Sequence, residues 1–213
     1  MNDPEERRAR VAGARLYLVT DGRGGGEPLR DFLDAVLGAG VDLVQLREKA
    51  MEARQQLDLA VIFRERCDAY GVPFIVNDQA DVALAARADG VHLGQDDLPV
   101  EEARRILGRD AIIGRSTHDT DQFRAALRED VDYVVTGPVH ATPTKPGRPG
   151  TGMDLVRLAA RETTKPWFVS GGMNLETLEE VRAAGGTGIV VVRAITEAKD
   201  PATASKELRA ALP

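Results

Sequence analysis

The stretch DLVQLREKAMEARQQLDLAVIFRERCDAYGVPFIVN, residues 42–77, places two short apolar runs on either side of a helical pattern. The runs 42–46 and 73–77 are rich in Val, Ile, Leu and Phe, which favours buried strands. The segment between them, 53–71, is long enough for a helix and ends at Gly71, a residue type common at helix C-termini. A strand, a crossover helix and a second strand make one unit of a parallel sheet covered by helices.

The same unit recurs along the 213-residue chain. Six further apolar runs predict strands, at 16–20, 90–94, 111–116, 132–137, 166–171 and 188–192. Helical patterns include 29–40, 175–185 with Asn174 as the expected N-cap, and 201–212 as the last helix. Eight such units predict an α/β fold, a single (β/α)8 TIM barrel over residues 1–213, with 1–13 as an N-terminal extension that could be flexible. A doubly wound open sheet is the alternative.

Composition argues against several classes of protein. A net charge of −6 with few aromatic residues argues against a nucleic-acid surface, although a local basic pocket remains compatible. No apolar run approaches the roughly 20 residues of a membrane span, and the first residues are charged, unlike a signal peptide. Cys67 is the only cysteine, which excludes an internal disulfide and a thiolate metal cluster. We expect a cytoplasmic protein with neither nucleic acid nor membrane as partner, and a homo-oligomer is compatible with these features.

A TIM barrel carries its active site at the carboxyl ends of its strands, so the polar residues found there are candidates. Gln45, Arg47 and Lys49 follow the second strand and alternate along an extended segment, so their side chains leave on one face and Glu48 on the other. Three donors on one face suit an anion. An edge of salt bridges fits the same pattern equally well.

Two carboxylates follow neighbouring strands. Asp78 and Asp97 come after the third and fourth strands, where two carboxylates completed by water and phosphate oxygens would make a Mg²⁺ site. Solvated loop aspartates are the alternative. Carboxylates beside cationic donors would repel an anion unless a divalent cation bridges them to a diphosphate, so the combination favours that arrangement.

Glycine and proline mark two further candidate segments. Gly171 and Gly172 precede an expected helix after the seventh strand, where TIM barrels commonly bind phosphate. The segment HATPTKPGRPGTG, residues 140–152, is too irregular for a helix and is either a solvated connection or a cover that grips an anion.

Three histidines near strand ends, His92, His118 and His140, offer a zinc hydrolase as an alternative. His92 alternates with apolar residues within a strand, which favours a packed or hydrogen-bonded barrel histidine over a metal ligand.

These residues stand in motifs that occur in a fixed order: VQLREK, VNDQADVALAARADGVHLGQDD, IIGRSTH, DYVVTGPVHATPTK and SGGM. The order resembles the thiamine phosphate synthase family, and the resemblance extends from LYLVTD to VVVRAI. It implies a single barrel that joins a hydroxymethylpyrimidine diphosphate to a thiazole phosphate, with Mg²⁺, and releases diphosphate by a dissociative substitution. A related thiazole tautomerase, a catalytically silent ligand-binding relative and a sugar-phosphate epimerase are the rival hypotheses.

The resemblance also implies roles for individual residues. The diphosphate ligands would be Gln45, Arg47, Lys49, Asn77 and Lys145, and the magnesium ligands Asp78 and Asp97. Ser116 would contact the pyrimidine substrate, and Thr142, Thr144, Gly172, Val192 and Arg193 would bind the thiazole phosphate. Arg47, Lys49, Ser116 and Lys145 would act in the chemical step. The sequence departs from the family pattern at Ser170, Met173 and Arg193, the last of which stands where serine is common.

Overall fold

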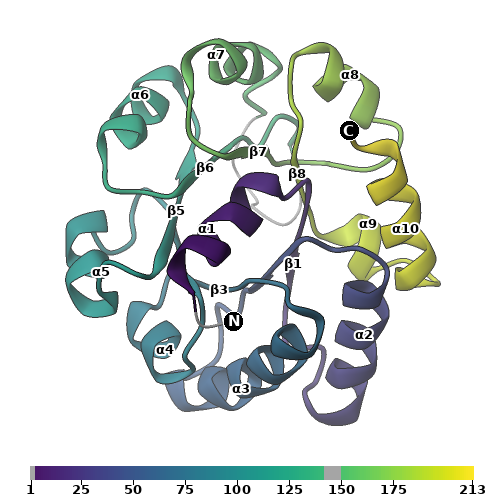
Figure 1. Ribbon diagram of the computed structural model, residues 1–213. Helices are drawn as coiled ribbons and strands as arrows, with labels where there is room; N and C mark the ends of the chain where they lie inside the picture. The colour runs from purple at the N-terminus through teal and green to yellow at the C-terminus, as the bar shows by residue number, and fades with distance from the viewer. Residues whose placement is uncertain (1–2, 142–149) are drawn as a thin grey trace.

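The structure is a computed structural model that describes residues 3–141 and 150–213. Its strands are β1 (Leu16–Thr20), β2 (Leu43–Leu46), β3 (Phe74–Asn77), β4 (Gly90–Leu93), β5 (Ile112–Thr117), β6 (Tyr133–Thr136), β7 (Trp167–Val169) and β8 (Ile189–Val191). Each strand pairs in parallel with the next, and β8 pairs with β1 to close the barrel (Figure 1). The predicted TIM barrel is therefore confirmed, and the open sheet is wrong.

Helices alternate with the strands and surround the barrel, except the first helix, which lies across one end (Figure 1). They are α1 (Pro4–Gly13), α2 (Gly26–Gly38), α3 (Ala53–Tyr70), α4 (Ala80–Ala85), α5 (Val100–Leu107), α6 (Thr120–Arg128), α7 (Asp154–Glu162), α8 (Leu178–Ala183), α9 (Arg193–Thr196) and α10 (Pro201–Ala211). The predicted C-terminal helix is α10, which begins after Asp200 because that carboxylate accepts hydrogen bonds from the backbone N–H groups of Ala202 and Thr203.

Helix α8 begins later than the sequence predicts. The prediction placed its N-cap at Asn174, but the helix starts at Leu178. Asn174 and Thr177 explain the difference, because each side chain accepts a hydrogen bond of 3.0 Å from the backbone N–H of the other. This reciprocal pair closes a turn of its own in front of the helix.

The barrel separates two apolar cores. Alternate residues of β1 show the division: Tyr17 and Val19 belong to the cluster inside the barrel, whereas Leu16 and Leu18 pack between strands and helices. Both faces of the strands are buried, which explains why the sequence shows continuous apolar runs instead of alternation. Polar side chains that point inward near the strand ends must therefore find partners or a ligand.

Helix α1 lies across the middle of the ring of strands in Figure 1. The residues interpreted as an N-terminal extension thus contain an ordered element. Asp3 caps the helix at the backbone N–H of Glu5, and Val11 is buried in the cluster inside the barrel. Arg8 extends the contact by donating to Asp132 at 2.8 Å. Helix α1 therefore closes the amino end of the barrel.

Carboxylates repeat at the amino ends of the even-numbered strands. Asp42, Asp89 and Asp132 lie just before β2, β4 and β6, and each accepts a backbone N–H at the start of the preceding strand. Each carboxylate also pairs with an arginine, at distances of 2.7–3.2 Å: Arg209 for Asp42, Arg64 for Asp89 and Arg104 for Asp132. These pairs fix neighbouring strands at the end of the barrel opposite the candidate site.

Among the described residues, no helix combines the length and the apolar character that a bilayer crossing requires.

Candidate active site

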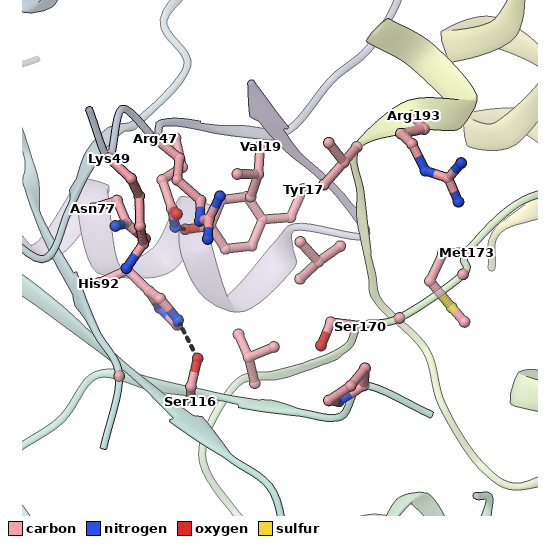
Figure 2. Close-up of a pocket in the computed structure, with 18 of the residues that line it drawn as sticks. Tyr17, Val19, Arg47, Lys49, Asn77, His92, Ser116, Ser170, Met173 and Arg193 are labelled. Atoms are coloured by element: carbon pink, nitrogen blue, oxygen red, sulfur yellow. Dashed lines mark hydrogen bonds between the residues drawn. The ribbon is translucent and has the colours of Figure 1, made fainter. Parts of the chain in front are cut away.

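A cavity of about 810 Å³ opens at the carboxyl ends of the strands (Figure 2). Its lining includes every described residue that the sequence proposed for the site: Gln45, Arg47, Lys49, Asn77, Asp78, Asp97, Ser116, Gly172, Val192 and Arg193. The other three candidates, Thr142, Thr144 and Lys145, lie outside the described residues. Residues from the ends of six strands thus meet at one cavity.

The end of β2 supplies donors to the cavity. Gln45 is 3% exposed, Arg47 is half-buried and the Lys49 side chain is 55% exposed. Glu48 turns away and accepts a hydrogen bond of 2.7 Å from the backbone N–H of Gly22, so the predicted alternation is confirmed. In the part of the chain that the structure describes, no hydrogen bond or ion pair engages the Arg47 guanidinium, which leaves it available to an anion.

Two carboxylates meet beside these donors. The carboxyl groups of Asp78 and Asp97 lie close enough to interact, and Lys49 Nζ lies 2.8 Å from Asp78 Oδ2. Burial raises the pKa of Asp97, and the contact with Asp78 raises it further. The backbone N–H of Gly94 donates to Asp97 Oδ2 at 2.6 Å and holds this carboxylate toward its neighbour. Two carboxylates held together in this way favour a bound cation between them.

Asn77, the last residue of β3, carries an unsatisfied donor. The residue is 7% exposed and lines the cavity, and its Nδ2 has no partner among the described residues. A buried amide N–H without an acceptor is costly. A ligand oxygen in the cavity would satisfy it.

A hydrogen-bond network inside the barrel was not predicted from the sequence. Gln45 donates to the Tyr17 hydroxyl, and this hydroxyl lies 2.8 Å from that of Tyr133. His92 Nδ1 lies 3.1 Å from the Tyr133 hydroxyl. Its Nε2 lies 2.9 Å from Ser116 Oγ, the contact drawn as a dashed line in Figure 2. We call these five residues the barrel network. The prediction that His92 is a hydrogen-bonded barrel histidine is confirmed.

The opposite side of the cavity is built by the ends of β7 and β8. Figure 2 shows Arg193 and Met173 across the cavity from Arg47, Lys49 and Asn77. Arg193 is exposed, and in the described ranges it forms no ion pair with Glu197, the partner that an outward-pointing charge would have used. The cavity therefore has cationic side chains on two opposed sides.

The loop after β7 lies against the loop after β6. Gly171 has φ +101°, and a Cβ at this position would lie 2.5 Å from Pro138 Cα. Val139 N donates to Ser170 O at 2.8 Å and joins the two loops. Within the described residues, the backbone N–H of Gly172 has no acceptor, which leaves it available to a ligand.

Both ends of the segment 140–152 are anchored at this rim. Thr151 N donates to Pro138 O at 2.7 Å, and Gly152 N donates to Val139 O at 3.1 Å. Pro138 itself lines the cavity.

The three histidines have separate partners. His118 Nδ1 contacts Gly137 O, and His140 Nε2 lies 2.5 Å from Glu180 Oε1, while His92 belongs to the barrel network. Across residues 3–141 and 150–213, no group of three or more His, Cys, Asp or Glu side chains is placed to hold a metal ion. The geometry gives no support to a zinc hydrolase.

Further cavity residues were not singled out as ligands from the sequence. They include Tyr17, Val19, His92, Gln95, Asp96, Val135 and Asn174. Gln95 is fixed by a 2.6 Å hydrogen bond from its Nε2 to Ser116 O. The GQDD segment after β4 signals a polar strand end, but Tyr17, Val19 and Val135 lie in apolar runs and look like ordinary core residues.

Comparison with known proteins identifies the family. Residues 16–195 match the family described as thiamine monophosphate synthase. The thiamine-phosphate synthase of Acidothermus cellulolyticus is 54% identical over 207 residues, covering 96% of this chain and 98% of its own. The thiamine-phosphate synthase of Thermobifida fusca is 53% identical, and the match covers 96% of this chain and 95% of the relative. The solved structure of a thiamine phosphate pyrophosphorylase from Pyrococcus furiosus superposes with a TM-score of 0.85 at 31% identity and covers 95% of this chain and 96% of its own.

The family match spans most of the chain, and the relatives align with it almost end to end. The resemblance first recognised in the motifs is therefore confirmed. The chain belongs to the thiamine monophosphate synthase family.

Proposed function

We propose that this chain is a thiamine-phosphate synthase, which joins a hydroxymethylpyrimidine diphosphate to a thiazole phosphate and releases diphosphate. The observation that carries the proposal is a single cavity with donors for anions on two opposite sides. Two phosphorylated substrates need two anion-binding sites. A reaction between the substrates requires that both sites lie in the same cavity. The names of the relatives support the same activity.

We also propose that Mg²⁺ binds at Asp78 and Asp97. Mg²⁺ is usually held by one or two carboxylates, with water and substrate phosphate oxygens as its other ligands. The proximity of these two carboxyl groups fits that donor set. When bound, the ion would neutralise charge on the diphosphate leaving group.

In the proposed reaction, the bond between the pyrimidine methylene carbon and the diphosphate oxygen breaks first. The electron pair leaves with the diphosphate, and a pyrimidinylmethyl cation forms. Arg47, Lys49 and Asn77 would donate to the departing oxygens, and Lys145, which lies outside the described residues, is proposed to act with them. This route requires no nucleophile from the protein.

The thiazole nitrogen then supplies the electron pair for the new carbon–nitrogen bond. We propose that Gly172, Val192 and Arg193 bind the phosphate of this substrate, so that its nitrogen faces the methylene carbon. Thr142 and Thr144 remain proposed partners of the same phosphate and lie outside the described residues. Exclusion of water protects the cation until the nitrogen attacks.

The rival hypotheses predict other outcomes. A thiazole tautomerase would isomerise one substrate without releasing diphosphate. A silent relative would bind both substrates without turnover, and a sugar-phosphate epimerase would leave the paired carboxylates without a role. We further propose a cytoplasmic location, since both substrates are charged metabolites.

One assay separates these hypotheses. The purified chain is incubated with both substrates and Mg²⁺, and thiamine phosphate and diphosphate are quantified together, with each substrate and the metal omitted in turn. We expect equal amounts of the two products and none in any omission. Binding of both substrates without product would contradict the proposal, and the Arg47→Ala protein purified in parallel controls for a contaminating enzyme.

A further inference from the structure

The barrel network ends at Ser116, and its hydrogen bonds have a direction. The Gln45 amide is oriented with its nitrogen toward the Tyr17 hydroxyl, and in this orientation the nitrogen can only donate, so the hydroxyl accepts from it. Tyr17 must then place its own proton on another acceptor, because a buried hydroxyl proton without one is costly. In the described part of the chain, the acceptor at hydrogen-bonding distance from this hydroxyl is the Tyr133 oxygen, 2.8 Å away.

Proton donation continues in the same direction from Tyr133 to Ser116. Tyr133 accepts from Tyr17, so its proton goes to His92 Nδ1, 3.1 Å away. Nδ1 is then the unprotonated nitrogen, and the neutral ring carries its proton on Nε2. Nε2 donates to Ser116 Oγ over 2.9 Å, which leaves the serine proton free to point into the cavity.

The opposite direction leaves a proton without a partner. If Ser116 donated to His92, the ring would donate to Tyr133 and Tyr133 to Tyr17. With the Gln45 nitrogen facing it, Tyr17 would then accept from Gln45 and from Tyr133, and no acceptor in the described ranges would take its own proton unless the Gln45 amide turned over. Tyr17 is fully buried, so water does not replace that acceptor.

Packing holds the network rigidly in place. The rings of His92 and Tyr133 stack with centroids 5.6 Å apart, and Phe168 meets the edges of both tyrosine rings at 5.3 and 5.7 Å. A Cβ at Gly114 would overlap the Tyr133 ring, so glycine at this position of β5 makes room for the phenol. Burial also raises the pKa of both tyrosines, which keeps their hydroxyl protons in place.

We propose that Tyr133 and His92 are positioning residues that fix Ser116 as a hydrogen-bond donor to the pyrimidine substrate. Neither residue needs to touch the reacting atoms, because each acts through the next member of the network. The ligand atom that meets Ser116 must then be an acceptor. The role in catalysis rests on the proposed function, whereas the tautomer of His92 does not.

The ¹⁵N NMR spectrum of the histidines tests the tautomer directly. A ring nitrogen that carries a proton and one that does not differ widely in chemical shift, and at about pH 8 an ordinary imidazole is neutral. We expect His92 Nε2 to be protonated and Nδ1 unprotonated in the wild-type protein. The signals that disappear in His92→Gln identify the ring. A protonated Nδ1 in the wild-type protein would overturn the proposal.

Two matched tyrosine variants test which hydroxyl fixes the tautomer of His92. Tyr133→Phe removes the donor to His92 and should give a mixture of tautomers, with shifts intermediate between the two forms. Tyr17→Phe removes a hydroxyl one step further away and should leave the tautomer unchanged, because Tyr133 can still donate to Nδ1. Equal changes of the His92 ¹⁵N chemical shifts in both variants would contradict the assigned direction of the hydrogen bonds. Thermal unfolding of each variant verifies that it is folded.

Kinetics then test the link to Ser116. Tyr133→Phe should lower kcat/KM for the pyrimidine diphosphate about three- to tenfold, the range expected for one lost hydrogen bond, and leave KM for the thiazole phosphate unchanged. In a Ser116→Ala background the same change should have no further effect, because the residue it acts through is gone. Additive losses would reject a positioning role. If the chain makes no thiamine phosphate, the NMR result still stands as an independent test of the network.

Discussion

Arg47 and Asn77 differ from their neighbours in the cavity, because within the described residues their side-chain donors meet no protein acceptor. Lys49, by contrast, already pairs with Asp78 at 2.8 Å. Unsatisfied donors beside a pair of carboxylates suit a ligand that is itself an anion bound with a cation. We therefore propose that Arg47 and Asn77 bind the leaving diphosphate.

Arg47→Ala should slow the reaction. A lost donor to developing negative charge typically raises the barrier by about 2–4 kcal/mol, so kcat should fall while KM for the thiazole phosphate stays near the wild-type value. Steady-state kinetics with each substrate varied in turn measure the split. Arg54→Ala, at an exposed position of α3 outside the cavity lining, is the matched control and should behave as wild type. Equal damage to both substrates would indicate a disturbed fold.

Asp97→Asn should remove most activity through the metal. Asparagine keeps an oxygen that can accept from the Gly94 N–H but loses the anionic ligand. We expect a higher Mg²⁺ concentration for half-maximal rate, measured by titration of the metal at saturating substrates. Asp81→Asn, exposed on α4, is the control. An unchanged Mg²⁺ requirement in Asp97→Asn would show that the metal lies elsewhere.

Arg193→Ser tests the residue at which this chain departs from its family. Arginine can grip a phosphate with two parallel hydrogen bonds that serine cannot make. We expect KM for the thiazole phosphate to rise several-fold and KM for the pyrimidine diphosphate to stay unchanged, in the same two-substrate kinetics. Unchanged KM values for both substrates would show that Arg193 does not bind the phosphate.

The elements of the fold were predictable to different extents. All eight strands could be found from the sequence, because both of their faces are buried and each reads as an apolar run. Helix α1 could not, since its sequence is strongly polar and Val11 alone of its residues is buried. The start of α8 was misplaced because Asn174 caps a turn with Thr177 instead of the helix.

The candidate site was predictable where polar residues end strands, and unpredictable inside the barrel. Asp78 and Asp97 follow apolar runs, so their place at the rim follows from strand order alone. Tyr17 and Tyr133 lie 116 residues apart in the chain, and only closure of the barrel brings their hydroxyls together. No local pattern in the sequence marks such a pair.

Gly171→Ala should disturb the contact between the loops after β6 and β7. The new Cβ would lie 2.5 Å from Pro138 Cα at φ +101°, so the β7 loop must move. We expect weaker binding of the thiazole phosphate, measured by calorimetric titration, with a smaller effect on the pyrimidine diphosphate. Gly24 has a similar positive φ of +83°, but a Cβ there would meet nothing within 4 Å. Gly24→Ala therefore measures the effect of backbone strain without displacement of a neighbouring loop. Identical affinities in the two variants would contradict the assignment.

The two ends of the barrel have different roles in the whole molecule. At the amino end, helix α1 and the aspartate and arginine pairs fix the strands. At the carboxyl end, polar side chains line a cavity, and among the described residues Asn77 Nδ2 there has no partner. Substitutions at the two ends should therefore change different quantities.

Asp89→Ala should lower stability without changing binding. This carboxylate is 2% exposed and bonds to both Arg64 and the Phe74 N–H, so its loss leaves the Phe74 donor unpaired and leaves Arg64 with Asp68 alone. Removal of one partner of a buried pair typically costs about 3–5 kcal/mol. Urea unfolding measures the loss, and KM for both substrates should stay at the wild-type values. Asp34→Ala breaks a more exposed pair, with Arg66, and should cost about 0–1 kcal/mol. A large change in KM for Asp89→Ala would refute the division between the two ends.

The central claim is that one cavity holds both products of the proposed reaction with their phosphates on opposite sides. A crystal structure of the chain with Mg²⁺, diphosphate and thiamine phosphate tests it most directly. The account predicts diphosphate against Arg47, Lys49 and Asn77, the metal between Asp78 and Asp97, and the phosphate of thiamine phosphate at Gly172 and Arg193. Diphosphate bound at Gly172 and Arg193, or a metal held away from both aspartates, would contradict it.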